Sequence, residues 1–238
     1  MRDSLHPSSI ESRLSADGPI ILPALLLCDF GHLDDEIRRL EAAGAKALHL
    51  DVMDGLFVPQ LTYGLVVVEA VRRAATVPIE VHMMVERPDE SVIQYTRAGA
   101  DIVTVHIEGL AKTKETLATI EATGSQAHLA LSPGTPVSHV VPFLDNCSGV
   151  LVMSVEPGFG GQAFQASAIE KIEKLQEIRT SSGRDFRIGV DGGISTKTIA
   201  SVAHAGADLI VAGSAVLRQT DYADALRELE DLARKSKG

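Results

Sequence analysis

The segment TRAGADIV, residues 96–103, carries the pattern that decides the fold. It joins the end of an amphipathic helix to an apolar strand through one glycine. Glycine is favoured there because it readily adopts the left-handed backbone that terminates a helix. The same design recurs in EAAGAKAL (41–48) and AHAGADLI (203–210). Recurrence of one unit along a chain indicates a fold built from repeated supersecondary structures.

Eight strand–helix units can be traced from these repeats outward. The expected strands cover residues 20–26, 45–52, 78–85, 100–107, 126–132, 149–155, 186–191 and 207–213. The expected helices cover residues 33–43, 65–75, 89–98, 111–123, 136–144, 163–181, 195–205 and 221–236. Eight parallel units in a chain of 238 residues predict the α/β class and a (β/α)₈ TIM barrel. An open, doubly wound sheet is the alternative.

The domain organisation is expected to be simple. No linker or shift in composition divides residues 20–238, so they are assigned to one catalytic barrel domain. Residues 1–19 are assigned to a flexible N-terminal extension. This segment lacks the apolar stretch of a signal peptide, and its acidic residues Asp3, Glu11 and Asp17 disfavour a transit peptide.

Composition excludes several classes of function. The net charge of −10 argues against nucleic acid as a partner, because a phosphate backbone requires basic surface. A small phosphorylated ligand stays compatible, since backbone amides can hold it. No apolar run reaches the length of a transmembrane helix, so no membrane association is expected. The two cysteines, Cys28 and Cys147, form no disulfide pattern, which favours a reducing, cytoplasmic location.

The stretch HLDVMDG (49–55) places polar side chains in an apolar strand. His49 and Asp51 are two residues apart and therefore face the same side. Taken alone, the pair is more simply explained as two core residues bonded to each other. However, His82 lies near the end of the third expected strand and Asp191 ends the seventh. In a barrel these four side chains meet at one mouth, and two imidazoles with two carboxylates suit Zn²⁺, Fe²⁺, Mn²⁺ or Co²⁺.

Glycine-rich turns follow three of the later strands. The turns DGG (191–193) and AGS (212–214) follow the seventh and eighth strands, where barrels often bind phosphate. The turn PGFGGQ (157–162) follows the sixth strand and is predicted to be a mobile lid, although a plain flexible loop fits it too. Met53, Met84 and Met153 at three strand ends are predicted to form an apolar cavity wall. His106, which ends the fourth strand, is assigned a structural role, with a place in the cavity lining as the alternative.

Five segments together resemble the ribulose-phosphate 3-epimerase family, also called pentulose-5-phosphate 3-epimerases. They are HLDVMDGLFVPQLTYG (49–64), EVHMMVERP (80–88), VMSVEPGFGGQAF (152–164), VDGGI (190–194) and VAGSA (211–215). The resemblance runs in order from about Ile20 to about Leu217. It implies a (β/α)₈ barrel that converts D-ribulose 5-phosphate to D-xylulose 5-phosphate, a step of the pentose phosphate pathway. It also implies a divalent metal, with Zn²⁺ as the first expectation, and a homo-oligomer.

The resemblance also implies roles for individual residues. The implied metal ligands are His49, Asp51, His82 and Asp191. Asp51 and Asp191 are the implied acid and base, which move a proton at C3 through an enediolate. The implied substrate and phosphate contacts are His82, Gly158, Phe159, Gly160, Gly161, Gly192, Gly193, Gly213 and Ser214.

Several positions depart from the family pattern, and three of them bear on the substrate. Members usually carry a serine where this chain has Ala24, a small polar residue where it has Leu27, and a histidine where it has Leu56. These changes keep two alternatives open. One is a 3-epimerase acting on another ketose phosphate, such as a hexulose 6-phosphate. The other is a catalytically silent barrel that binds a sugar phosphate.

Overall fold

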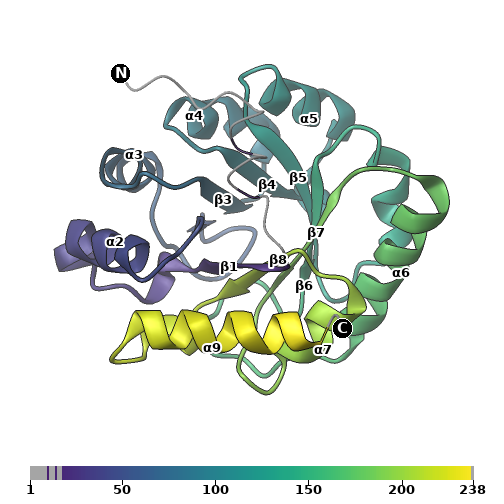
Figure 1. Ribbon diagram of the computed structural model, residues 1–238. Helices are drawn as coiled ribbons and strands as arrows, with labels where there is room; N and C mark the ends of the chain where they lie inside the picture. The colour runs from purple at the N-terminus through teal and green to yellow at the C-terminus, as the bar shows by residue number, and fades with distance from the viewer. Residues whose placement is uncertain (1–9, 11–13, 15–17, 237–238) are drawn as a thin grey trace.

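In the computed structural model, which describes Ile10, Leu14 and residues 18–236, a barrel of parallel strands is ringed by helices (Figure 1). The strands are β1 Ile20–Pro23, β2 Leu48–Met53, β3 Ile79–Met84, β4 Ile102–His106, β5 Gln126–Leu131, β6 Gly149–Met153, β7 Arg187–Asp191 and β8 Leu209–Ala212. They pair in the order β1-β8-β7-β6-β5-β4-β3-β2, and a parallel bridge from Ala24 to His49 links the first and last of these. The predicted (β/α)₈ barrel is confirmed, and the open doubly wound sheet is wrong.

Helices connect successive strands on the outside of the barrel (Figure 1). The α-helices are α2 Leu33–Ala42, α3 Leu65–Ala74, α4 Val92–Arg97, α5 Thr113–Glu121, α6 Ser167–Ser182, α7 Ile199–Ala205, α8 Ser214–Leu217 and α9 Tyr222–Lys235. Short 3₁₀ helices are η1 Leu25–Leu27, η2 Phe30–His32, η3 Pro88–Glu90, η4 Ile107–Gly109, η5 Val137–His139 and η6 Val141–Phe143.

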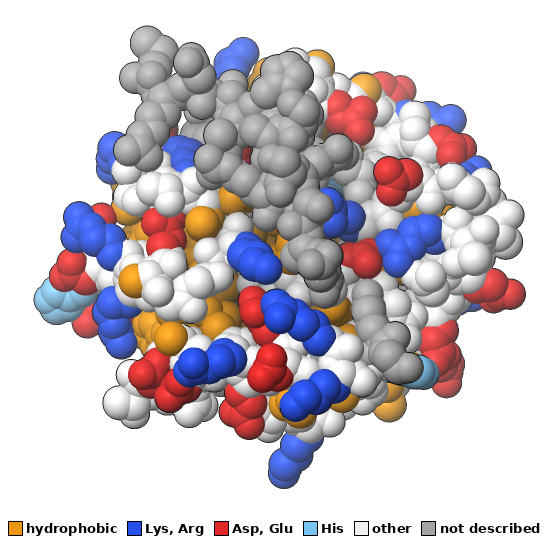
Figure 2. Space-filling model, viewed as in Figure 1, with side chains coloured by type: hydrophobic (Ala, Val, Ile, Leu, Met, Phe, Trp, Pro, Cys, Tyr) orange, Lys and Arg blue, Asp and Glu red, His pale blue; other side chains and the backbone are white. Residues whose placement is uncertain are grey.

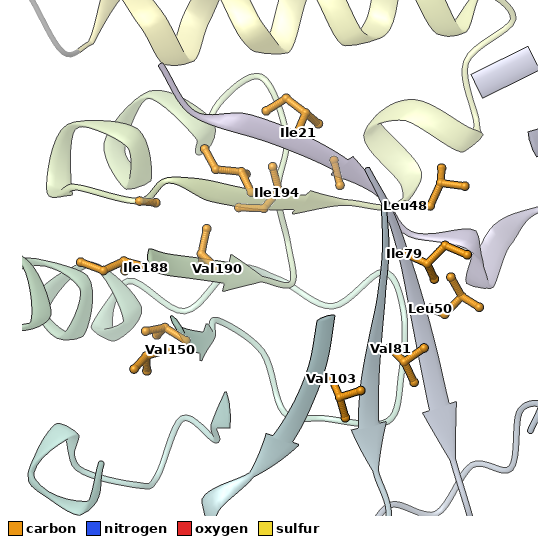
Figure 3. Packing of buried hydrophobic residues seen from close by; sticks show 14 of the residues in the cluster. Ile21, Leu48, Leu50, Ile79, Val81, Val103, Val150, Ile188, Val190 and Ile194 are labelled. Atoms are coloured by element: carbon orange, nitrogen blue, oxygen red, sulfur yellow. The ribbon is translucent and has the colours of Figure 1, made fainter. Parts of the chain in front are cut away.

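Alternation along the strands separates an outer apolar layer from a mixed interior. Leu48 and Leu50 of β2 and Val81 of β3 belong to the buried layer shared by strands and helices, part of which Figure 3 shows. Each side chain buried in this way contributes about 1.5–3 kcal/mol. The residues that alternate with these along each strand, such as His49 on β2 and His82 on β3, point into the barrel. Successive side chains of a strand face opposite sides of the sheet. Polar side chains are thus directed into the barrel.

Two of the three repeated glycine-containing segments also carry a structural ion pair. Asp101, two residues after the glycine of the 96–103 repeat, accepts a hydrogen bond from Arg72 of α3 at 2.7 Å. The same carboxylate oxygen accepts the backbone N–H of Ile79 at 2.8 Å, at the start of β3. Asp208 of the third repeat forms the corresponding pair with Arg179 of α6. The aspartate therefore ties a helix and the neighbouring strand to the loop before its own strand.

Replacing Asp101 should destabilise the barrel strongly. Only 8% of its side chain is exposed, and truncating one partner of a buried ion pair costs about 3–5 kcal/mol. We expect Asp101→Ala to lower the free energy of unfolding by this amount in urea titrations. The matched control is Asp34→Ala, whose exposed pair with Arg38 on α2 should be worth about 0–1 kcal/mol. Equal losses in the two variants would contradict this account.

One expected helix is absent as such. Residues 136–144 form the two short 3₁₀ helices η5 and η6 rather than one α-helix. Pro142 at the start of η6 has no N–H to donate, and proline also disfavours the α conformation in the residue before it. The one short helix expected near 136–144 is therefore divided into two 3₁₀ turns.

Several boundaries also differ from the expected ones, three of them at the carboxyl-end face of the barrel. Strand β1 ends at Pro23, and the chain then turns into η1 instead of continuing as a strand to residue 26. Helix α6 starts at Ser167 and α7 at Ile199, each four residues later than expected. In both cases the preceding residues belong to the loop after a strand, where they line or adjoin the mouth of the barrel.

Two residues of the N-terminal segment are buried. Ile10 and Leu14 are each 1% exposed and lie in one cluster with the barrel-interior residues Ile20, Leu22 and Ile102. The Leu14 backbone N–H donates to the Ile10 carbonyl at 2.9 Å. The expected flexibility of residues 1–19 concerns positions that mostly lie outside the described residues.

The surface in Figure 2 carries basic and acidic side chains intermixed over the outer helices. Such mixing is typical of a solvated surface. Every helix in the described part of the chain is too short or too polar to cross a membrane.

Candidate active site

A cavity of about 260 Å³ opens at the carboxyl ends of the strands. It is bounded by strand ends and by the loops that follow them, as expected for the active face of a barrel. The predicted site residues that line it are Asp51, Met53, Met84, Met153, Gly158, Phe159, Gly160, Gly161, Asp191, Gly192, Gly193, Gly213 and Ser214. His49 and His82 do not line it, because both rings are fully buried beneath its floor.

Four donors converge at the floor of the cavity and just beneath it. One ligand-capable atom from each of His49, Asp51, His82 and Asp191 lies within 4.8 Å of all the others. His49 Nε2 is 3.2 Å from Asp51 Oδ1, and His82 Nδ1 is 3.3 Å from the same oxygen. Asp191 Oδ2 lies 3.8 Å from His49 Nε2 and 3.7 Å from His82 Nδ1. The three strands β2, β3 and β7 thus deliver two imidazoles and two carboxylates to one point.

The end of β2 is fixed by the loop that follows it. Strand β1 ends at Pro23, and after it a single bridge joins Ala24 to His49. Within the described part of the chain, the end of β2 therefore has no strand beside it on the β1 side. The Asp51 N–H donates to Tyr63 Oη at 3.0 Å, and Thr62 Oγ1 donates to the Asp51 carbonyl at 2.7 Å. The Met53 N–H donates to Thr62 Oγ1 at 3.0 Å. The LTYG part of the loop therefore replaces a missing strand and holds Asp51 in place.

The end of β7 is fixed by Ser154, just after β6. Its hydroxyl lies 2.8 Å from the Asp191 carbonyl and 2.5 Å from the Gly192 carbonyl, to which it donates. Gly192 and Gly193 have φ of +107° and +60°, a left-handed backbone that side chains rarely adopt. A Cβ on Gly193 would lie 2.7 Å from the Phe164 backbone. Glycine is required for this tight turn beside Asp191.

The electrostatics of the cluster favour a positive charge between its carboxylates. Burial alone would lower the pKa of His49, but the carboxylates of Asp51 and Glu80 outweigh it and hold this pKa well above its usual value. Burial also opposes ionisation of Asp51, yet the adjacent histidines lower its pKa. Burial and the charge of Asp51 raise the pKa of Asp191. Two carboxylates in one buried site repel each other unless a positive charge lies between them.

The donor set fits a divalent metal ion. It combines two imidazole nitrogens with two carboxylate oxygens, a mixture suited to Zn²⁺ and its neighbours in the first transition row. Each histidine also has a buried partner on its outer side, as metal-binding imidazoles usually do. These four residues could therefore hold one metal ion.

Sequence reasoning missed the residues behind the histidines. Glu80 Oε2 lies 3.0 Å from His49 Nδ1, and His106 Nε2 lies 2.9 Å from His82 Nε2. Glu108 in turn contacts His106. A signal was present for Glu80, because it shares a face of β3 with His82 and an unpaired carboxylate in a buried strand is costly.

The upper walls of the cavity combine methionines with the loop after β6. Met53 and Met84 pack together with Val58, and each is no more than 3% exposed. Gly158 lies against Val58, so this loop meets the loop after β2. Phe159 is 53% exposed. The Gln162 side-chain amide donates to the carbonyls of Glu156 and Phe159 at 2.6 and 2.9 Å, which folds the loop back on itself.

Comparison with known proteins identifies the family. The model of the ribulose-phosphate 3 epimerase family matches residues 20–217. This chain belongs to the ribulose-phosphate 3-epimerase family. The ribulose-phosphate 3-epimerase of Bacillus subtilis (strain 168) is 42% identical over 210 residues, which cover 88% of this chain and 97% of the relative. The Escherichia coli (strain K12) enzyme of the same name is 40% identical over 219 residues, covering 91% and 97%.

Solved structures place the epimerase-family barrel among other TIM barrels. KGPDC from Streptococcus mutans matches with a TM-score of 0.73 at 17% identity, covering 92% of this chain and 99% of that one. Thiamine phosphate pyrophosphorylase from Pyrococcus furiosus matches with a TM-score of 0.61 at 15% identity, covering 93% and 98%. At these identities the likeness concerns the fold alone.

Metal binding should raise the thermal stability of this epimerase-family chain. A ligand that binds only the folded state adds about 2.7 kcal/mol when its free concentration is a hundred times Kd. We expect Zn²⁺ or Co²⁺ to raise the Tm of chelator-treated protein, and His49→Ala to abolish the rise. His204→Ala, which alters an exposed histidine on α7, is the control and should keep it. An equal rise in all three proteins would show that the metal binds elsewhere.

Proposed function

We propose that this chain interconverts D-ribulose 5-phosphate and D-xylulose 5-phosphate by inverting C3, using two carboxylates at one divalent metal site. The observation that carries the proposal is the convergence of Asp51 and Asp191 with two histidines at the floor of the cavity. Membership of the ribulose-phosphate 3-epimerase family and the names of its close relatives support the substrate. An intact donor set counts against a catalytically silent barrel.

Inversion at C3 requires proton transfer on both faces of one carbon. The C3 proton is acidic because it lies α to the C2 ketone, so a carboxylate can remove it as a general base. A second carboxylate on the opposite face returns a proton to the same carbon. Asp51 on β2 and Asp191 on β7 are suited to these roles, because β1 and β8 separate their strands around the barrel. They exchange roles when the reaction runs in reverse.

The unequal environments of the two carboxylates support the division of roles. The pKa of Asp51 is held low by the neighbouring histidines, whereas burial and the charge of Asp51 raise the pKa of Asp191. Carboxylates whose pKa values are pushed apart can serve as base and acid in one step. A bound cation would supply Lewis-acid stabilisation of negative charge on the sugar oxygens and would offset the repulsion between the carboxylates.

The glycine turns after β7 and β8 are proposed to bind the phosphate. Gly192, Gly193, Gly213 and Ser214 line the same cavity as the two carboxylates. The absence of side chains at the glycines lets backbone amides approach an anion closely. Glycines 158, 160 and 161, with Phe159, are proposed to contact the substrate from the loop after β6. Met53, Met84 and Met153 would keep water away from the reacting carbon.

The remaining finer assignments are part of the same proposal. The metal ligands are His49, Asp51, His82 and Asp191, and Zn²⁺ is the first candidate, with Fe²⁺, Mn²⁺ and Co²⁺ as alternatives. A homo-oligomer and a cytoplasmic location are also proposed. Both cysteines are free thiols in the structure, which agrees with a reducing compartment.

One observation favours a second candidate substrate. Ala24 and Leu27 line the cavity at positions where the family usually has polar residues, while Leu56 is 72% exposed and lies outside its lining. An apolar wall at Ala24 and Leu27 offers no hydrogen bond to a sugar hydroxyl. A hexulose 6-phosphate epimerised at C3 by the same carboxylates is therefore the alternative.

Incubation of metal-loaded protein with D-ribulose 5-phosphate in D₂O tests the function. NMR should show D-xylulose 5-phosphate carrying deuterium at C3, because the returned proton comes from a carboxyl group in exchange with solvent. Turnover of a hexulose 6-phosphate, with little of the pentulose, would favour the alternative. A metal-loaded protein that turns over neither sugar would contradict the proposal.

Removing one carboxylate should separate proton exchange from inversion. In Asp191→Asn or Asp51→Asn, epimerisation should fall by about 10²–10⁴-fold, because one face lacks its acid or base. The remaining carboxylate can still remove and return a proton on its own face. We therefore expect each variant to exchange deuterium into only one epimer at C3, and the two variants to select opposite epimers.

Metal content must be measured in the same samples, because both carboxylates are proposed ligands. Exchange into both epimers by either variant, with metal bound, would show that a different group acts on the second face.

A further inference from the structure

The two ring nitrogens of His82 have different neighbours. Nδ1 faces the donor cluster, 3.3 Å from Asp51 Oδ1. Nε2 lies 2.9 Å from Nε2 of His106, and the two rings are stacked with centroids 5.0 Å apart. Both histidines are fully buried, so solvent does not supply the missing hydrogen-bond partners. At 2.9 Å, one of the two Nε2 atoms must donate a proton to the other.

The outer side of His106 decides which nitrogen donates. Its Nδ1 is 3.1 Å from Oε2 of Glu108. The Ser132 hydroxyl lies 3.3 Å from the same nitrogen and can rotate to accept from it. An ionised carboxylate can only accept, so His106 Nδ1 must carry the proton. A charged imidazolium at this buried position would be penalised by desolvation, so the ring has a single N–H. His106 Nε2 is then an acceptor, and the N–H of that contact belongs to His82 Nε2.

This chain of contacts leaves Nδ1 of His82 with a lone pair. We propose that Glu108 is a positioning residue that, through His106, fixes the tautomer and orientation of His82 in which Nδ1 can bind a metal. The inference rests on the proposed function only in taking His82 as a ligand. Asp51 Oδ1 also lies 3.3 Å from Nδ1 of His82, and a metal ion held by both residues would let these two acceptors lie together. The hydrogen-bond order from Glu108 to His82 therefore belongs to the metal-binding form of the site.

Glu108 is itself held in place from both sides. Its Oε1 accepts the backbone N–H of Ser132 at 2.8 Å, at the end of β5. The ammonium group of Lys171 on α6 donates to the carbonyls of Ser132, Pro133 and Thr135 at 2.7–2.8 Å. The loop that contains the Ser132 N–H is thus held against α6 by these three hydrogen bonds. Glu108 cannot turn away without losing this bond.

His49, the other histidine of the donor cluster, also has a glutamate on its outer side, but no second histidine lies between the two. Glu80 Oε2 contacts His49 Nδ1 directly, and its Oε1 accepts the Thr104 hydroxyl at 2.5 Å. The difference lies in the second partner of each glutamate. A hydroxyl can rotate from donor to acceptor, whereas the backbone N–H of Ser132 can only donate. Replacing each glutamate by glutamine therefore has unequal consequences.

Glutamine at position 80 can satisfy both neighbours. Its carbonyl accepts from His49, and its amide group donates to the rotated Thr104 hydroxyl. Glutamine at position 108 cannot do the same. If its carbonyl accepts from Ser132, its amide group donates to His106 Nδ1. His106 must then carry its proton on Nε2 and donate it to His82 Nε2, so the proton of His82 lies on Nδ1. If its carbonyl accepts from His106, two donors oppose each other at Ser132.

The test compares E108Q, E80Q and E115Q, the last being an exposed glutamate on α5 that makes the same change in charge. Zn²⁺ affinity is measured by competition with a chromophoric chelator at one fixed pH. We expect E108Q to lose about 10–100-fold in affinity, E80Q to lose less, and E115Q to match the parent protein. E108D, which keeps a carboxylate, should recover part of the loss. Circular dichroism confirms that each variant is folded.

A second readout reports the position of the proton instead of metal affinity. Long-range ¹H–¹⁵N NMR of histidine-labelled protein shows which nitrogen of His106 carries its proton, with the signal assigned by its loss in H106Q. We expect Nδ1–H in the parent protein and a shift toward Nε2–H in E108Q.

The two readouts separate failure of this proposal from failure of the proposed function. Two results would contradict the proposed role of Glu108. One is Nε2–H at His106 in the parent protein, and the other is parent-like Zn²⁺ affinity in E108Q. A parent protein that binds no Zn²⁺ yet shows Nδ1–H at His106 would contradict the metal site and leave the hydrogen-bond order supported.

Discussion

The candidate site depends on the two-residue alternation of side chains along strands in a closed parallel barrel. Because Leu48 and Leu50 must face the helices, His49 and Asp51 must face the interior. Closure then aims the interior residues of β3 and β7 at the same point. A one-residue slip in any of these strands would exchange its polar and apolar faces, so the register that builds the core also builds the donor cluster.

Burying these polar side chains inside the barrel costs free energy. Hydrogen bonds beneath the cavity and at its mouth offset that cost. Beneath the cavity, Glu80 accepts from Thr104 and contacts His49, so the buried carboxylate has partners on both oxygens. At the mouth, Tyr63 and Ser154 bind the backbones of the strand ends that carry Asp51 and Asp191. These bonds leave the four inner donor atoms facing one another. A divalent cation would stabilise that arrangement better than protons, because it would attract all four donors at once.

The barrel and the four donors could be predicted from sequence because their signals are local and periodic. The glycine-centred repeats mark the helix ends, and polar residues two apart in apolar strands mark the inner face. The loops after strands were harder, since α6 and α7 each begin four residues later than the periodicity predicted and Pro142 divides a helix into two short turns. At α6 and α7 the residues before each helix belong to loops that line or adjoin the cavity, whereas the third difference is a local effect of proline.

The supporting residues were missed for a different reason. A histidine such as His106 at a strand end looks the same in sequence whether it packs or relays a hydrogen bond, and its role emerges only once β3 and β4 are side by side. The sequence alone also does not distinguish Ala24, Leu27 and Leu56, since each replaces a polar residue of the family pattern. The structure separates them, because only Ala24 and Leu27 line the cavity.

The central claim is that one metal ion is bound by residues of β2, β3 and β7 at the floor of the cavity. X-ray absorption spectroscopy of the zinc-loaded protein tests it most directly. The account predicts a first shell of nitrogen and oxygen donors with two imidazoles, and the loss of one imidazole in His49→Ala or His82→Ala. A shell without imidazole, or one that neither substitution changes, would contradict it.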